Sequence, residues 1–187
     1  MRIYIIRHGE TNHNKKKIIQ GQFDNDINSK GFYQAKLLAN RFKDFNLKNV
    51  YSSDLKRAKN TALEVLKYHK DCKLVLDKRL RERSFGELEN KNIPSDFSWD
   101  NLPDFVEKRD SLYKRVKSFL DDIKLRHKGE EVFIFTHGGI KRVMTYILNG
   151  NELPYEDLKF YNTSVTIVNV NNEKSEFKVI NCTNHLD

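Results

Sequence analysis

Two histidines occupy near-identical places in the sequence, each after a short apolar run and before a glycine. The run 3–6 leads through Arg7 to His8, and the run 132–135 leads towards His137. Because residues just past the ends of parallel strands point into the ligand crevice of an α/β sheet, we expect the two side chains to meet at one sheet edge. A histidine pair beside an arginine is suited to an anionic, phosphorylated ligand.

The segment Arg7-His8-Gly9-Glu10-Thr11 combines three useful residue types. Glycine lets the backbone turn sharply and lets a ligand approach closely. The planar fork of arginine matches phosphate oxygens, and histidine can act as a nucleophile, an acid or a base near neutral pH. The alternative is a histidine that only satisfies its hydrogen bonds at a strand end. These five residues alone leave both interpretations open.

A second arginine has a similar position. Arg57 is expected in the first turn of a helix, just after a short strand that ends at Ser52. A helix start offers free N–H groups and a favourable dipole for anions. A lone arginine there is usually a surface charge, but together with Arg7 it predicts a second phosphate clamp.

A histidine nucleophile that cleaves a phosphate ester leaves an alkoxide, which needs a proton. A carboxyl group held near the site could supply that proton as a general acid. The loop after the third expected strand contains Glu82, Glu87 and Glu89. An isolated loop glutamate is usually just solvated, and residue chemistry alone does not choose among the three.

Hydrophobic periodicity predicts alternating strands and helices. The expected strands lie at 2–6, 50–52, 73–76, 132–135, 164–170 and 176–180, with a hairpin turn at Asn171-Asn172 between the last two. The expected helices begin near Ser29, Asp54 and Asp104, and a fourth, after His137, carries Ile140, Val143, Met144, Ile147 and Leu148. The stretches 11–28 and 81–103 are expected to be irregular, the second as a candidate lid over a site. This order predicts a three-layer α/β/α sandwich with a mainly parallel central sheet, as a single domain over residues 1–187.

For the first two of these helices, the sequence also predicts the N-terminal capping residue and the apolar face. Ser29 is a plausible cap of the first of these helices, and Asp54 of the next. Helical spacing gives the first an apolar face of Phe32, Ala35, Ala39 and Phe42, and the second one of Ala58, Ala62, Leu63 and Leu66.

Composition narrows the class of protein. No stretch approaches the roughly 18 apolar residues of a membrane helix, and the apolar part of the start is too short for a signal peptide, so we expect a cytoplasmic protein. Cys72 and Cys182 are too few for a disulfide framework and are expected to be reduced. The net charge of +8 is spread along the chain, which favours solvated lysines and steering of small anions over nucleic-acid binding.

The chain resembles the histidine phosphatase superfamily, also called the phosphoglycerate-mutase-like family. The resemblance rests on four spaced motifs: Arg7-His8-Gly9-Glu10-Thr11, the pattern Ser53-x-Leu55-x-Arg57-Ala58-x-x-Thr61-Ala62, Leu80-Arg81-Glu82 with Phe85-Gly86, and Thr136-His137-Gly138-Gly139. It extends through Asn14, Gln20-Gly21, Gly31 with Gln34-Ala35, and Asn162-Thr163-Ser164-Val165. The match therefore covers nearly the whole chain in the family's order.

The resemblance implies a phosphoglycerate-mutase-like fold and a role for each matching residue. His8 would be the nucleophile and would form a phosphohistidine. Arg7, Arg57 and His137 would hold the phosphoryl oxygens, and Asn14 would add a hydrogen bond. Glu82 would protonate the leaving oxygen and then help to activate water. The resemblance implies no metal and no other cofactor.

A metal site is the natural rival for two histidines near carboxylates. His8 and His13 lie in a glycine-containing loop that continues to Asp24 and Asp26, but this reproduces no recognised ligand spacing. The other histidines, including His13, are expected to be surface or packing residues. The chain departs from the family pattern where Asn90 replaces a frequent glycine after Glu89, and at Arg109-Asp110-Ser111. These departures concern the walls that read the rest of the substrate.

The family includes hydrolases and mutases, which differ in whether water or a returning hydroxyl takes the phosphoryl group. Family mutases carry a longer insertion between the acid and the second histidine, whereas Glu82 and His137 lie 55 positions apart here (137 − 82). The sequence therefore favours a phosphatase of small phosphorylated metabolites, similar to the broad-specificity and α-ribazole phosphatases. A phosphoglycerate mutase and a non-catalytic phosphate-binding module remain alternatives. We expect a monomer or homodimer, with no nucleic-acid or membrane partner. Asp96, Phe97, Trp99 and Phe105 are candidates for the substrate mouth, but core or lid packing is the favoured role for each of the aromatic residues.

Overall fold

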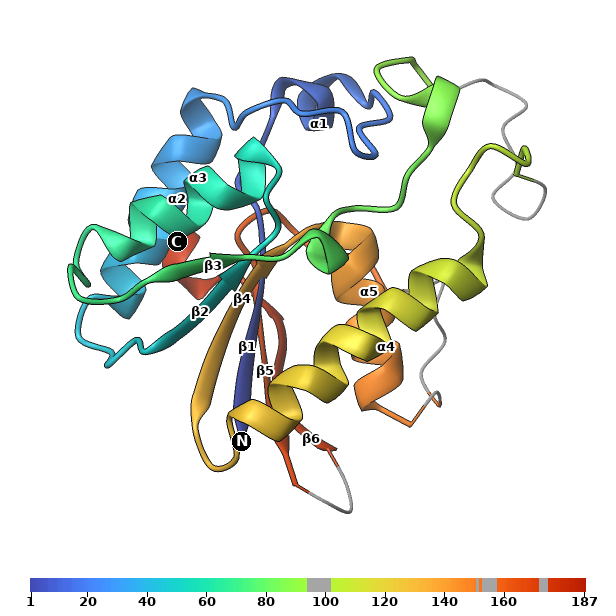
Figure 1. Ribbon diagram of the computed structural model, residues 1–187. Coiled ribbons are helices and arrows are strands. Elements are labelled where there is room, and N and C mark those ends of the chain that lie inside the picture. The colour runs from blue at the N-terminus through green and yellow to red at the C-terminus, as the bar shows by residue number, and fades with distance from the viewer. Residues whose placement is uncertain (94–101, 151, 153–157, 172–174) are drawn as a thin grey trace.

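A six-stranded sheet with the order β3-β2-β4-β1-β5-β6 runs through the middle of the computed structural model (Figure 1). The structure describes residues 1–93, 102–150, 152, 158–171 and 175–187. The strands are β1 (Arg2–Arg7), β2 (Asn49–Ser52), β3 (Leu74–Leu76), β4 (Glu131–Thr136), β5 (Val165–Val170) and β6 (Ser175–Cys182). Strands β1 to β4 are mutually parallel, and β5 runs antiparallel to β1 and β6. The expected mainly parallel sheet is confirmed.

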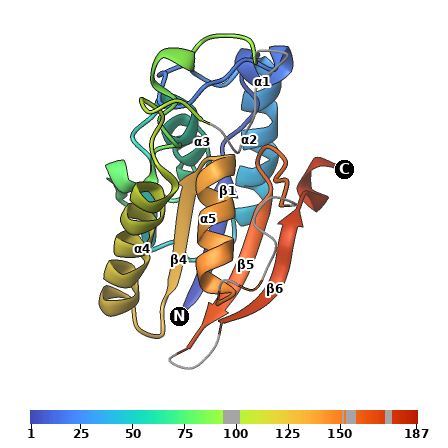
Figure 2. The same cartoon turned by 90° about the vertical axis from the view of Figure 1, so that its right-hand side faces the viewer.

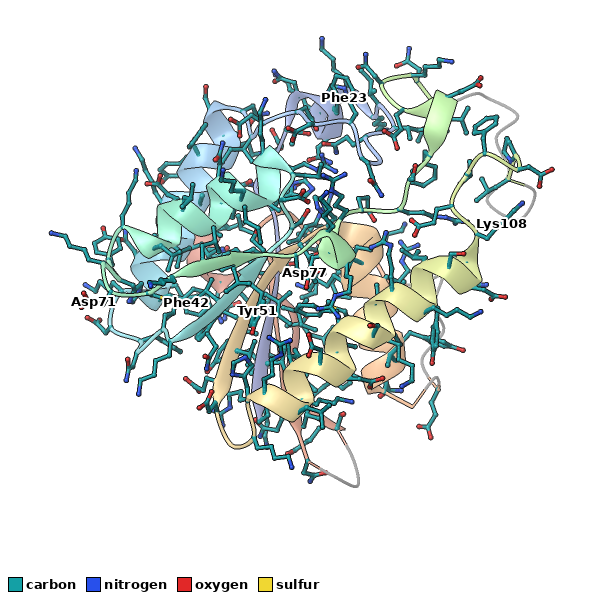
Figure 3. The ribbon with its side chains drawn as sticks, in the orientation of Figure 1. Phe23, Phe42, Tyr51, Asp71, Asp77 and Lys108 are labelled. Atoms are coloured by element: carbon teal, nitrogen blue, oxygen red, sulfur yellow. The ribbon has the colours of Figure 1, made fainter. Side chains whose placement is uncertain are left out.

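Helices cover both faces of this sheet (Figures 1 and 2). The long helices are α2 (Ser29–Phe42), α3 (Lys56–Leu66), α4 (Arg109–Arg126) and α5 (Gly138–Leu148). Strand β1 shows why two layers form, because its side chains alternate between them. Ile3 and Ile5 pack in the core with α4 and α5, whereas Tyr4 and Ile6 pack in the core with α2 and α3. Phe42 belongs to the second core and Tyr51 to the first (Figure 3).

Burial on both faces explains the near-continuous apolar runs of the central strands. Residues 3–6 and 132–135 are all buried. Both strands point their carboxyl ends towards the top of Figure 1, where α1 (Asn12–Lys16) and the loops gather. The expectation that the two histidine segments end at the same sheet edge therefore holds. None of the described helices is long and apolar enough to cross a membrane.

The helix starts differ from the expectations. Asn28, not Ser29, caps α2, because its side chain accepts a hydrogen bond from the Gly31 amide. Helix α3 has no cap from its own flank, and the Lys56 amide instead donates to Asp24 at 2.7 Å. Asp54 pairs with Arg81, at 2.7 and 2.6 Å. A partner distant in sequence took the capping role, which local spacing does not reveal.

The helix faces and irregular stretches also needed correction. Phe32 and Leu63 are 39% and 42% exposed, since α2 and α3 bury neighbouring residues such as Leu38 and Val65 instead. Helix α4 begins at Arg109 rather than near Asp104. The expected loop 11–28 contains the one-turn helix α1, which a capping box at Thr11 stabilises.

The described part of the 81–103 stretch is anchored rather than loose. Phe85 packs with Ile19 and Val106 in a small third core, and the Asn90 amide donates to the Ile19 carbonyl at 2.8 Å. Asp96, Phe97, Trp99 and part of the expected Asn171-Asn172 turn lie outside the described residues. Phe105 is 46% exposed, and Cys72 and Cys182 are free thiols.

Candidate active site

His8 and His137 lie side by side at the carboxyl ends of β1 and β4. The parallel register sets Arg7 opposite Thr136, and the His8 amide donates to the Thr136 carbonyl at 2.9 Å. The two ring centroids are 5.2 Å apart, with the rings tilted by 58°. Both side chains are buried, so the sheet register alone brings together two residues that are 129 positions apart in sequence (137 − 8).

The hydrogen bonds of His8 define its tautomer. Its Nδ1 lies 2.7 Å from the Gly9 carbonyl oxygen. A carbonyl can only accept, so Nδ1 carries the proton and Nε2 keeps its lone pair. Burial first, then Arg57 and Arg7, hold the pKa of His8 well below its usual value. His8 thus presents a neutral, unprotonated Nε2, which is the form that a nucleophile requires.

His137 has the opposite tautomer. The Arg57 Nε–H donates to Nδ1 of His137 at 3.1 Å, so this nitrogen is the acceptor. The proton is then on Nε2, which donates to the Ser53 hydroxyl at 2.9 Å. Burial, followed by Arg57 and His8, also lowers the pKa of His137 well below its usual value. His137 is therefore a neutral hydrogen-bond donor.

Arg57 is fully buried, and the loop 21–25 surrounds its guanidinium. It donates through Nη1 to the Phe23 carbonyl and to Asn25 Oδ1, and through Nη2 to the Gly21 carbonyl. With the bond to His137, these contacts use four of its five N–H groups. Burial lowers the pKa of Arg57 to about 10, so the group stays charged at neutral pH.

Arg7 has a buried donor without a partner. Its Nη1 donates to the Phe160 carbonyl, but within the described residues its Nε–H donates to no partner. A Cβ built on Gly138 would lie 3.4 Å from this Nε, so the donor faces the start of α5. Burial lowers the pKa of Arg7, and the negative charge of Glu82 partly opposes this effect. A buried unpaired N–H is costly, and a bound anion oxygen would satisfy it.

The structure distinguishes the three candidate acids. Glu82 reaches the start of α5, where its Oε2 accepts from the Gly139 amide at 2.9 Å, and its Oε1 accepts from the Arg83 amide. Glu89 instead holds the loop, accepting from the Gln22 and Phe85 amides. Glu87 is exposed. Of these three, the electrostatic coupling to Arg7 and Arg57 is largest for Glu82.

Asn14 is also held at this edge. Its Oδ1 accepts from the Thr11 amide at 3.1 Å and from Asn162 Nδ2 at 3.3 Å. The same Asn162 amide donates to the His8 carbonyl at 3.0 Å. Because the oxygen of Asn14 is used for these contacts, its Nδ2 is the group turned towards other partners. All six residues expected at the site thus converge on one sheet edge.

Sequence reasoning missed several residues that build this edge. Arg115 of α4 donates to the carbonyls of Arg79, Arg81 and Glu82 and pairs with Glu107, so it fixes the backbone that carries Glu82. Its position beside the apolar face of α4 gave no indication in the sequence that it has this role. Lys141 is fully buried behind the site, where Nζ donates to Ser164. Burial and Arg7 lower its pKa well below the usual value.

No group of three or more His, Cys, Asp or Glu side chains in the described ranges could hold a metal ion. His13 and Asp24, which belonged to the rival metal interpretation, have other contacts. His13 bonds Asn90 and Asn25, and Asp24 caps α3.

Known proteins resemble this chain in both sequence and fold. The chain is 35% identical to "Metal-independent phosphoserine phosphatase" of Arabidopsis thaliana, over 92% of this chain and 77% of that protein. It is 33% identical to "Phosphoglycerate mutase-like protein 4" of the same plant, over 88% and 77%. The solved structure of YhfR from Bacillus stearothermophilus superimposes with a TM-score of 0.90, at 28% identity, and covers 100% of this chain and 99% of that one.

A family model matches nearly the whole chain. The model of the histidine phosphatase superfamily (branch 1) covers residues 3–183, which include every residue of the site described above. The chain therefore belongs to branch 1 of the histidine phosphatase superfamily.

Proposed function

We propose that the chain hydrolyses small phosphomonoesters in two steps, through a phosphohistidine on His8. The observation that carries this proposal is the pair of opposite tautomers. His8 presents a lone pair on Nε2, and His137 beside it presents an N–H donor. A nucleophile next to donors for the transferring oxygens is the arrangement that phosphoryl transfer needs.

In the first step, His8 Nε2 attacks phosphorus and the ester P–O bond breaks. The leaving alkoxide takes a proton from the carboxyl group of Glu82. Arg7 would bind a phosphoryl oxygen through its unpaired Nε, and His137, Asn14 and the remaining N–H of Arg57 would stabilise the developing charge. The positive charges of the two arginines complement a phosphate dianion.

In the second step, water attacks the phosphohistidine. The Glu82 carboxylate takes the proton from this water, the P–N bond breaks, and inorganic phosphate leaves while His8 Nε2 regains its lone pair. Proton transfer to and from one positioned carboxyl serves both steps. Every group named here belongs to the chain, so we propose a reaction without a metal or other cofactor.

Small phosphorylated metabolites are the proposed substrates. The name of the Arabidopsis relative supports phosphoserine as the first compound to test. The resemblance to α-ribazole phosphatases makes α-ribazole 5′-phosphate the second. We further propose that residues 1–187 act as one domain in the cytoplasm, as a monomer or homodimer, without a nucleic-acid partner.

Phosphoglycerate mutase activity is the second candidate, because one relative has a mutase-like name. The short spacing between Glu82 and His137 favours hydrolysis. The two activities separate in one experiment, which measures phosphate release from a panel of monoesters with EDTA present, beside interconversion of 2- and 3-phosphoglycerate. We expect phosphate release that EDTA does not affect and that is lost in His8→Ala. Interconversion without net release would support the mutase. If neither phosphate release nor interconversion is detected, the proposed function is overturned.

A further inference from the structure

A continuous belt of hydrogen bonds joins the two histidine segments around the site. One half begins at the His8 carbonyl, where Asn162 donates to it and also to Asn14. The other half begins at His137, which accepts from Arg57, and Arg57 in turn donates to Asn25. The residues that link the halves are Thr11 and Gln20.

Each bond of the link pairs a donor with an acceptor. The Thr11 amide donates to Asn14 Oδ1, and the Thr11 hydroxyl donates to Gln20 Oε1 at 2.8 Å. The same Gln20 oxygen accepts from Asn25 Nδ2 at 3.0 Å. Asn25 Oδ1 then accepts from Arg57 Nη1 at 3.0 Å. Because the amide oxygens of Asn14, Gln20 and Asn25 all accept in these bonds, the belt fixes the orientation of each of these amides.

The side chain of Asn25 makes three hydrogen bonds, two within the belt and one outside it. The second hydrogen of its Nδ2 goes to His13 Nδ1 at 3.2 Å, and His13 Nε2 lies 2.8 Å from Asn90 Oδ1. The left-handed residue Asn90, with φ +62°, thus braces Asn25 from the loop that follows the acid. This gives Asn90, which departs from the family pattern, a contact that leads to Arg57.

We propose that Asn25 and Asn162 are positioning residues for the proposed phosphoryl transfer. Asn162 fixes the half with His8 and Asn14, and Asn25 fixes the half with Arg57 and His137. Asn25 does this with a neutral oxygen, which orients the guanidinium without neutralising it. Through the Arg57 Nε–H, this orientation also selects the tautomer in which His137 donates from Nε2. The inference rests on the proposed function only for its kinetic consequences.

The test uses Asn25→Ala, Asn162→Ala and a matched control, Asn169→Ala. Asn169 also accepts a side-chain bond, from Arg2, but lies at the far end of β5. Three measurements are made: the steady-state kinetics (kcat and KM) for a monoester, the inhibition constant of inorganic phosphate, and the imidazole ¹⁵N shifts of the free enzyme. The shifts report tautomers without turnover, so absence of activity in the wild type would sink only the proposed function.

Asn25→Ala should raise the phosphate inhibition constant and lower kcat/KM by about ten- to a hundredfold, as expected for misplaced catalytic groups. It should also reduce the Nε2–H tautomer of His137. Asn162→Ala should weaken phosphate binding while leaving the His137 tautomer as in the wild type. Asn169→Ala should behave as the wild type throughout. An unchanged His137 tautomer together with unchanged phosphate inhibition in Asn25→Ala would overturn the proposal.

Two further variants separate positioning from packing. Asn25→Asp keeps the shape and the acceptor oxygen but places a negative charge beside the Arg57 guanidinium. Phosphate should therefore bind more weakly to Asn25→Asp than to Asn25→Ala. A packing role predicts the reverse order. In the double variant that combines Asn25→Ala with Asn162→Ala, the effects on kcat/KM should be less than multiplicative. Either substitution alone already breaks hydrogen bonds of the belt and loosens the rest. Fully multiplicative effects would contradict the belt, and Asn25→Ser replaces Asn25→Ala if the latter does not fold.

Discussion

The carboxyl ends of β1 and β4 have the same strand–His–Gly sequence pattern but opposite chemistry. At the end of β1, the Gly9 carbonyl accepts the Nδ1 proton of His8 and leaves Nε2 unprotonated. At the end of β4, Arg57 donates to Nδ1 of His137 and moves the proton to Nε2. One neighbouring acceptor and one neighbouring donor thus give two similar histidines opposite tautomers, which suit the proposed roles of nucleophile and hydrogen-bond donor. The sequence pattern predicts where each histidine lies, and the hydrogen-bond partner of its Nδ1 determines its tautomer.

Loss of the nucleophile should have the largest effect. We expect His8→Ala to lower kcat/KM by about 10⁴-fold or more, because no covalent intermediate can form. Steady-state phosphate release measures this, and circular dichroism checks the fold. Phosphate release at the wild-type rate in His8→Ala would show that His8 is not the nucleophile and would contradict the proposed difference between His8 and His137.

Removal of the donor should cost less. His137→Gln is expected to lower kcat by about 10²- to 10³-fold, as measured for the loss of one oxyanion donor in other enzymes. The phosphohistidine should still form, only more slowly, which rapid quench of a single turnover detects. If His137→Gln abolished the intermediate as completely as His8→Ala does, the two histidines would not have the separate roles proposed here.

The acid is tested through the leaving group. Glu82→Gln should slow alkyl phosphates by about 10²-fold or more, but p-nitrophenyl phosphate much less, because that leaving group needs little protonation. Glu87→Gln, on the same loop but exposed, is the matched control and should leave both rates unchanged. Equal slowing of both esters in Glu82→Gln would indicate a structural role instead.

The two glycines after His137 allow a finer test. A Cβ on Gly139 would lie 2.3 Å from Glu82 Oε1, so Gly139→Ala must displace the acid, and we expect a fall in kcat of roughly tenfold. A Cβ on Gly138 would lie 3.4 Å from Arg7 Nε, an ordinary contact, so Gly138→Ala should have a smaller effect on kcat. Kinetics of the two variants on one alkyl ester give the comparison, and the reverse order would contradict the placement of Glu82.

The smallest effect concerns stability and pH. Both buried histidines have pKa values well below their usual value, whereas in the unfolded chain they protonate near about pH 6.5. As the pH falls below this value, the unfolded chain binds protons that the folded chain does not, so the free energy of unfolding decreases. Urea unfolding between pH 7.5 and 5.5 should show this slope, and a His8→Asn, His137→Asn double variant should show less of it. An identical slope in both proteins would mean that the two groups titrate normally.

The sequence allowed prediction of what depends on period and strand order. The apolar runs 3–6 and 132–135 predicted two buried central strands, and the strand-end rule then brought His8 and His137 together. Local sequence spacing did not predict a helix cap when the capping residue comes from another loop. Asp54 looked like a helix cap, but Asp24 has that role because the Arg57 contacts hold its loop against α3.

Residue chemistry alone could not choose among the acids, and only the family resemblance singled out Glu82. The tautomers lay beyond the sequence. Glu82, Glu87 and Glu89 are alike in type and differ only in which amides they meet, and those amides belong to α5 and to the loop at Gln22. The tautomer of His137 depends on one N–H of Arg57. Such contacts form only once the sheet has brought the two halves of the chain together.

The most direct test of the central claim is to locate the phosphoryl group in the trapped intermediate. An enzyme quenched with alkali during turnover and analysed by mass spectrometry and ³¹P NMR should contain one phosphohistidine, at Nε2 of His8. A phosphoryl group on His137, on Nδ1 of His8, or on no histidine during active turnover would contradict the account.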